Sequence, residues 1–239
     1  MNKVFCKKGL LFSLIFTGYL ILFNTSCGLD TFYVINGPKN VRHSPVHSSN
    51  DYAENYFEFY VGDANTGIRF LGTDVYYKIY KSSSTLETQV NDLITIANKD
   101  ESDAAARRMI ENYKYQPLRA RGHEGDNTLI SSSTASNTLV TIRLSDYTDQ
   151  YLAQITIGSG TSSIGVPVRL TDTTLSFTFT SLTPDKQPKT GDSDVNESGS
   201  SSENVWYVSM FALAQGQDAT YSPLYSNILY LGSVKIPNE

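Results

Sequence analysis

The stretch Asp74–Lys81 reads DVYYKIYK, and its alternation decides the fold class. Successive side chains of an extended chain point to opposite faces. One face takes Val75, Tyr77 and Ile79, and the other takes Tyr76, Lys78 and Tyr80. β-Branched and aromatic residues favour strands. The stretch therefore predicts a β-strand with an apolar face.

Comparable stretches occur on both sides of this one. Tyr56–Val61 (YFEFYV) is rich in aromatic residues, and in Leu175–Thr180 apolar residues alternate with Ser and Thr. The predicted strands are Phe32–Ile35, Tyr56–Val61, Asp74–Lys81, Thr138–Ser145, Leu152–Ile157, Val166–Leu170, Leu175–Leu182, Val205–Ala214 and Asn227–Ile236. Short strands separated by turn residues favour a mainly β, antiparallel sandwich or barrel.

One region departs from this pattern. Ser84-Thr85-Leu86-Glu87 is a capping box, and apolar residues follow it at helical spacing. A second helix is expected near Ser102, and it must stop before Pro117. We therefore expect a helical insertion over about 84–117. We interpret it as a cap over an open edge or end of the sandwich, with a recognition surface as the alternative.

The stretch Lys186–Asn204 is polar and rich in Ser and Gly, which predicts a long disordered loop over about 186–204. It contains a weak calcium candidate, because alternate positions carry oxygen ligands and a Glu follows at the twelfth position. The four candidate ligands are Asp192, Asp194, Asn196 and Glu203. Glu197 stands where the calcium turn uses Gly, so an acidic loop without a metal is the competing interpretation.

Several of these stretches together resemble fibronectin type III and related immunoglobulin-like modules. Val75–Tyr80 is similar to their third strand, and Leu175–Asp185 (LSFTFTSLTPD) is similar to their fifth strand with its Leu-x-Pro turn. Val205–Ala214 (VWYVSMFALA) and Tyr221–Asn227 resemble the sixth strand and the run into the last one. The resemblance implies a β-sandwich of the kind used for adhesion, spacing and binding.

The first 26 residues have the three parts of a secretory signal. Lys3, Lys7 and Lys8 supply positive charge, and Gly9–Phe23 is uncharged and apolar. Small polar residues then lead to Cys27. An apolar core of roughly 7–15 residues is typical of a cleaved signal, whereas a membrane-spanning helix needs about 20. We therefore expect residues 1–26 to be removed.

The run Phe23–Cys27 (FNTSC) resembles the lipobox of bacterial lipoproteins, in a leader similar to those of spirochaete lipoproteins. The resemblance implies that Cys27 carries lipid, that residues 27–31 form a short tether and that 32–239 form the β-sandwich domain. It also implies a location in the cell envelope, anchored by lipid outside the cytoplasm at the outer membrane or the periplasmic face. Two or three acyl chains anchor a protein stably.

Charge and motifs limit the function classes. The chain has 24 acidic and 19 basic residues, which argues against nucleic acid as a partner. His43, His47 and His123 are expected in loops, and no motif of a catalytic or cofactor site occurs, so we assign no catalytic residue and no cofactor.

The 16 tyrosines are the last signal. Eight of them cannot all face one core: Tyr52, Tyr56, Tyr60, Tyr76, Tyr80, Tyr221, Tyr225 and Tyr230. They indicate either an interface or sugar platform, or the ordinary composition of strands.

Taken together, these features predict a lipid-anchored, non-enzymatic binding, adhesion or structural module with a protein or glycan ligand. One alternative is an envelope hydrolase acting on glycans, and another is a carrier with a small-ligand pocket under the helical insertion. A flat tyrosine patch would favour the binding module, clustered inward carboxylates the hydrolase, and an apolar cavity the carrier.

Overall fold

The computed structural model describes residues 34–99, 102–158, 163–172, 174–179, 187–189, 191–199 and 204–237. These residues belong to one compact unit, Val34–Glu239. The predicted signal, Cys27 and the tether lie outside the described residues. Strands dominate the unit, as the sequence predicts, and most of their pairings are antiparallel.

The first sheet contains five strands in the order β1-β2-β7-β8-β9. Its strands are β1 (Lys39–His43), β2 (Phe57–Tyr60), β7 (Leu139–Arg143), β8 (Gln154–Ile157) and β9 (Ser163–Gly165). All four pairings are antiparallel, and Phe59 lies opposite Val140, which lies opposite Ile157. β2, β7 and β8 confirm three of the predicted strands within one or two residues at most ends.

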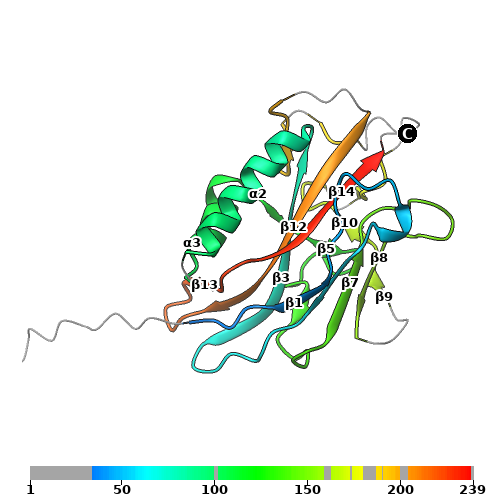
Figure 1. The fold of residues 1–239 in the computed structure, drawn as a ribbon. Coiled ribbons are helices and arrows are strands. Elements are labelled where there is room, and N and C mark those ends of the chain that lie inside the picture. Colours follow the sequence, from blue (N-terminus) through cyan, green and yellow to red (C-terminus); the bar gives the residue numbers. More distant parts are fainter. Residues whose placement is uncertain are drawn as a thin grey trace, which may run out of the picture. The chain divides into compact units, whose positions relative to one another are not determined.

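The second sheet is built on the long strands β3 (Arg69–Tyr80), β12 (Val205–Gln217) and β14 (Leu229–Pro237), which Figure 1 shows side by side. β12 pairs antiparallel with both β3 and β14. The short strands β4 (Gln116–Pro117), β6 (Ile130–Ser131), β11 (Val195–Asn196) and β13 (Pro223–Tyr225) extend this sheet. β5 (Arg119–Ala120) and β10 (Pro167–Val168) form a separate two-stranded pair.

The two sheets pack face to face around the main core. Val75, Tyr77 and Ile79 of β3 are fully buried there, against Phe57 and Phe59 of β2. The alternation that the sequence predicts for DVYYKIYK is therefore confirmed. Fully burying side chains of this size contributes about 1.5–3 kcal/mol each.

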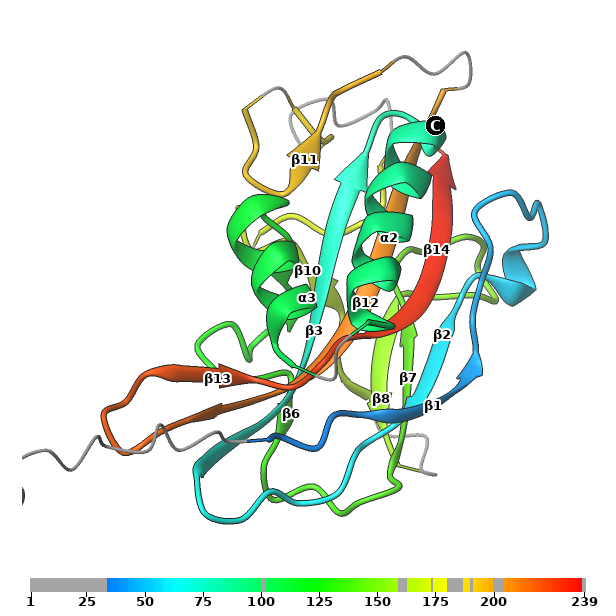
Figure 2. The ribbon, with the colours of Figure 1, turned by 60° about the vertical axis from the view of Figure 1, so that its left-hand side comes forward.

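The other face of the second sheet carries a second core, and Figure 2 shows α2 and α3 lying over it. The helices are α2 (Ser83–Ala97), α3 (Ala104–Arg107) and the π-helical turn η2 (Arg108–Asn112). Leu93 and Met109 pack against Tyr80 and Phe211. The helical insertion is confirmed, but its interpretation as a cap over an edge or end is wrong, because the helices cover a sheet face.

The second core also explains part of the tyrosine content. Tyr76 and Tyr80 are buried on the helix side of β3. The Tyr80 hydroxyl is 2.8 Å from that of Tyr115, which is 2.7 Å from the Ser209 hydroxyl. These tyrosines serve packing, as the strand-composition interpretation expects, and not an interface.

Four sequence predictions need correction. Val34–Ile35 form no strand, and the first strand of the described chain is β1. Residues 174–179 form none either, although Leu175, Phe177 and Phe179 are buried as the alternation predicts. The described part of the 186–204 loop is ordered around β11, because Asp194 is fully buried and β11 pairs parallel with β3. The insertion also ends earlier than expected, at Asn112, before Gln116–Pro117 form β4.

Candidate functional site

Aromatic side chains and one arginine gather at one end of the first sheet. His43 ends β1, Arg143 ends β7, and Tyr56 directly precedes β2. The register pairs His43 with Glu58 and Arg143 with Gln154, so these strand ends lie together. The short helix η1 (Tyr52–Glu54) lies at the same end. We call this group the tyrosine patch, and its members are His43, Tyr52, Tyr56, Arg143, Tyr147 and Tyr151.

The centre of the tyrosine patch is a layered stack. The Arg143 guanidinium carbon lies 5.3 Å from the ring centroid of Tyr56 and 4.9 Å from that of Tyr151. His43 stacks on Tyr56 with centroids 3.9 Å apart and ring planes 12° apart. An exposed cation–π contact contributes about 0.5–1 kcal/mol. Two such contacts on one guanidinium hold it in a fixed orientation.

Hydrogen bonds fix the same guanidinium to η1. Arg143 donates from Nη1 to the Tyr52 carbonyl at 2.8 Å and from Nη2 to the Ala53 carbonyl at 3.2 Å. Asp51 caps η1 by accepting from the Ala53 amide at 2.9 Å. Burial lowers the pKa of Arg143, but the ordinary value lies above 12, so the side chain is a cation at neutral pH.

A small cavity of about 50 Å³ adjoins the tyrosine patch, with Tyr52, Tyr147 and Asp146 in its lining. Tyr147 stacks on Tyr52 with centroids 5.3 Å apart. The Tyr147 hydroxyl is buried and has no hydrogen-bond partner within the protein, and burial raises its pKa. A cavity of this size holds a water-sized polar group, which such a hydroxyl needs.

All six side chains of the tyrosine patch are partly exposed. Glu54 and Glu58 stand beside it, and Glu58 accepts from the Thr141 hydroxyl at 2.9 Å and lies 3.5 Å from Arg42 Nε. The Tyr56 hydroxyl has its pKa raised by burial first and then by these two carboxylates. The patch thus offers apolar ring surface, hydroxyl groups and one fixed cation, which is the chemistry of a binding surface.

A groove of about 430 Å³ lies at the opposite end of the sheets. Leu71, Leu129, Ile157 and Ile164 supply its apolar lining. Its polar lining includes His123, whose Nδ1 is 3.0 Å from the Asp126 carboxylate. The volume falls within the range of small-ligand sites.

A buried ion pair backs this groove. Arg119 donates to the two carboxylate oxygens of Asp74 at 2.7 and 3.2 Å and to the Asn127 carbonyl at 3.2 Å. Asp74 also accepts from the Leu129 amide at 3.0 Å. Burial raises the pKa of Asp74, and Arg119 opposes that rise. The pair therefore fixes the segment that carries Asn127 and Leu129.

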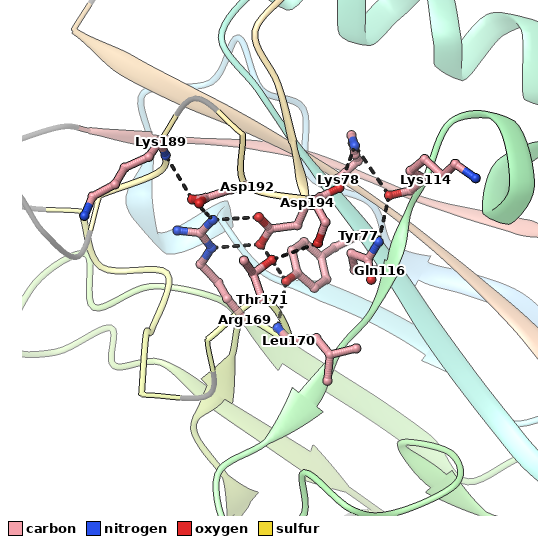
Figure 3. Close-up of polar contacts among 11 residues, drawn as sticks. Tyr77, Lys78, Lys114, Gln116, Arg169, Leu170, Thr171, Lys189, Asp192 and Asp194 are labelled. Carbon is pink, nitrogen blue, oxygen red and sulfur yellow. Dashed lines mark hydrogen bonds and ion pairs between the residues drawn. The ribbon is translucent and has the colours of Figure 1, made fainter.

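The calcium candidates have a different environment from the one the sequence suggests. Figure 3 shows the Arg169 guanidinium between Asp192 and Asp194, with the Tyr77 hydroxyl on Asp194. The guanidinium thus takes the place that the calcium hypothesis gives to a metal ion. The Asn196 side chain accepts from the Ser198 amide at 2.9 Å, and Glu203 lies outside the described residues. In the described ranges, no three His, Cys, Asp or Glu side chains form a metal-binding group.

The histidines are used in three separate places. His43 lies in β1, not in a loop as expected, and belongs to the tyrosine patch. His47 contacts the Ser233 hydroxyl at 2.8 Å and the Glu87 carboxylate at 3.3 Å.

Tyr52 and Tyr56 are the two predicted interface tyrosines that the structure brings to the patch. Tyrosine content alone does not identify Arg143, although the position of Arg143 near Tyr147 and Tyr151 in the sequence, at a predicted strand end, is a usable signal.

Among the residues described, no helix has the length and apolar character needed to cross a bilayer. No family model, curated protein or solved structure matches this chain. Function must therefore be inferred from the geometry and chemistry of the sites themselves.

Proposed function

We propose that this protein is a lipid-anchored, non-enzymatic binding module of the bacterial cell envelope, and that the tyrosine patch binds its protein or glycan ligand. The observation that carries the proposal is the Arg143 guanidinium held between Tyr56 and Tyr151. Tyr and Arg are the residues that contribute most often to binding energy at interfaces. Here they are pre-ordered on strand ends, so binding needs little further ordering.

The order of the strands supports a sandwich related to fibronectin type III and immunoglobulin-like modules. In those modules the first, second and fifth strands share one sheet, and the third, sixth and seventh share the other. Here β1, β2 and β7 are neighbours in one sheet, while β3, β12 and β14 are neighbours in the other. In this comparison β7 takes the place of the fifth strand, which the sequence resemblance assigns to Leu175–Asp185, because residues 174–179 form no strand. The helical insertion falls between β3 and β7, where such modules carry their fourth strand.

The anchor is proposed from the sequence. A basic head and an apolar core lead to the lipobox-like FNTSC, which ends at Cys27. Acylation of the Cys27 thiol would hold the domain at a membrane outside the cytoplasm. The hydrolase alternative gains little support, because the buried carboxylates of Asp74 and Asp194 are each committed to an arginine.

The test compares ligand capture by the domain lacking Cys27 with capture by Tyr151→Ala and Arg143→Ala variants, using envelope extracts and a glycan panel. We expect the parent domain to retain one protein or one glycan class that both variants lose. Arg121→Ala, at an exposed position outside the patch, is the control and should retain it. Equal retention by all four proteins would refute the patch as the binding site.

The groove supports a second candidate function, that of a small-ligand carrier. Its four apolar side chains and volume of about 430 Å³ suit an amphipathic molecule. This site differs from the predicted pocket under the helical insertion, where the side chains of the second core fill the interface. Titration with a fluorescent apolar probe, compared between the parent domain and Leu71→Asp, tests it: binding that Leu71→Asp abolishes would support the carrier.

A further inference from the structure

The end of the domain where the described chain begins is opposite the tyrosine patch. Val34–Pro38 lead into β1, and Lys39 at its start pairs with Tyr60 at the end of β2. The same segment reaches the second sheet, because a Cβ at Gly216 would meet Ile35 at 3.5 Å and Arg69 at 3.2 Å. The starts of β1 and β3 and the end of β12 therefore lie together. We call this the Val34 end.

The opposite end is defined by independent contacts. Tyr52 and Tyr147 of the tyrosine patch line a cavity with Ile236 and Pro237, where β14 ends. β14 starts at Leu229, and the segment before it lines a hollow together with Val34–Pro38. The contacts of both sheets therefore place the Val34 end and the tyrosine patch at opposite ends of the domain. Figure 2 shows the β13 arm on the same side as the start of β1.

The Val34 end exposes an aromatic residue in an unusual backbone conformation. Tyr221 is 68% exposed and has a φ of 64°, in the left-handed region that bulky residues rarely adopt. Asp218 fixes the turn by accepting from the amides of Thr220 at 2.7 Å and Ser222 at 2.9 Å. The fold therefore holds Tyr221 outward at the tip of the β12–β13 arm without burying it.

One basic group lies beside this tyrosine, and one apolar side chain is exposed at the same end of the domain. The Arg69 guanidinium lies 5.7 Å from the Tyr221 ring centroid and donates to Gln217 at 3.1 Å. Val34 is 79% exposed. The nearby acid Asp63 is paired with Lys39, and Asp218 is committed to its turn. Tyrosine rings are favoured at the level of lipid headgroups, and arginine binds phosphate oxygens.

The chain length fixes how far this end can stand from the anchor. Val34 follows Cys27 by seven positions, and a fully extended chain spans at most about 3.3–3.6 Å per residue. A lipid on Cys27 would thus hold the Val34 end within roughly 25 Å of the membrane surface. The patch would then face away from the membrane, toward ligands.

We infer that the Val34 end is a lipid-contacting surface, with Tyr221 and Arg69 at the headgroups of the membrane that carries the protein. This inference rests on the proposed lipid anchor and adds to it a defined orientation. A protein partner covering Tyr221 is the alternative occupant, and the experiment below separates the two.

The test uses the mature acylated protein, reconstituted into phosphatidylcholine vesicles with a minor share of phosphatidylglycerol. Ala219→Cys, beside Tyr221, and Gln150→Cys, beside Tyr151, are exposed positions at the two ends and can each carry an environment-sensitive fluorophore. Headgroup spin-labelled lipids should quench the label at 219 several-fold more strongly than the label at 150. Adding Tyr221→Ala should reduce quenching at 219.

Two outcomes overturn the orientation. The first is equal quenching of the labels at 219 and 150. The second is a label at 219 that lipid quenchers do not affect and that is also shielded from aqueous iodide, because that pattern indicates a protein partner. Failure of the anchor gives a different result. If Cys27→Ser remains equally membrane-bound, and the parent takes up no labelled palmitate, the proposed lipoprotein itself is refuted.

Discussion

Arg169 and Asp194 form a two-bond ion pair in which neither side chain is exposed to solvent. Arg169 donates from Nε to Oδ2 at 2.8 Å and from Nη2 to Oδ1 at 2.6 Å. Tyr77 of the main core donates to Asp194 at 2.8 Å as well. The pair therefore ties β11 and its flanking loop residues to the centre of the second sheet.

Asp194→Ala should destabilise the domain strongly. Removing one partner of a buried ion pair costs about 3–5 kcal/mol, because the other charge stays buried without compensation. Asp192→Ala should cost less, since its side chain is 21% exposed and Arg169 keeps both bonds to Asp194. Urea unfolding of both variants measures the difference. Equal losses would contradict the central role of Asp194.

The same carboxylate predicts a pH dependence. Burial raises the pKa of Asp194, but the hydrogen bonds and charge of Arg169 outweigh it and leave the pKa below its ordinary value. An unfolded Asp titrates near about 3.9. The pair therefore stabilises the fold fully above that pH, and the contribution disappears as the pH falls through the folded pKa. The stability gap between the parent and Asp194→Asn, measured by urea midpoints, should shrink below pH 4. A constant gap would contradict the assignment.

Local sequence patterns predict the helices and strands better than they predict what each element packs against. The alternation in DVYYKIYK indicates which residues share a face, and the helical spacing of apolar residues after Ser84 locates α2. The predicted capping box at Ser84 is wrong, because α2 begins at Ser83 with Ser82 at the N-cap position and no side-chain cap. Neither pattern could show that the helices cover Tyr76 and Tyr80, because that contact joins residues distant in sequence. The local sequence pattern of a strand that is buried on both faces can be the same as that of a half-buried strand with large aromatic residues. The pattern alone therefore cannot distinguish the two.

The candidate site was predictable only in part. Tyr52 and Tyr56 were identified as interface candidates, but the patch depends on Arg143, which strand pairing brings beside them from more than 80 residues away. The surroundings of the calcium candidates could not be predicted from spacing for the same reason. Spacing alone places Asp192 and Asp194 around a cation, and the cation that the fold supplies is Arg169.

The second core predicts a stability cost at the helix–sheet contact. Leu93 of α2 is fully buried against the sheet, so Leu93→Ala should cost about 2–5 kcal/mol. Thr95→Ala, on the exposed side of the same helix, is the control and should stay within about 0.5 kcal/mol. Thermal unfolding followed by circular dichroism measures both. A neutral Leu93→Ala would show that the helices contribute little to the fold.

Gly72 in β3 should tolerate no side chain. Its φ is 142°, and an added Cβ would lie 2.1 Å from the Ile130 carbonyl oxygen and 2.5 Å from the Thr128 hydroxyl. Gly72→Ala should therefore cost on the order of 1–3 kcal/mol and disturb the groove that Thr128 lines. Gly125→Ala, in the same groove but with open space around it, should be neutral. Denaturant midpoints that fall equally for both variants would contradict the steric argument.

Arg143→Lys separates charge from geometry in the tyrosine patch. Lysine keeps the positive charge but lacks the planar guanidinium that lies between Tyr56 and Tyr151 while donating to Tyr52 and Ala53. We expect the captured ligand to bind roughly tenfold more weakly, a loss of about 1.4 kcal/mol. The fold should lose no more than about 1 kcal/mol, because the site is partly exposed. Arg121→Lys, an exposed arginine outside the patch, is the matched control and should bind like the parent in titration calorimetry. Undiminished binding by Arg143→Lys would mean that the ligand needs only a positive charge at this position.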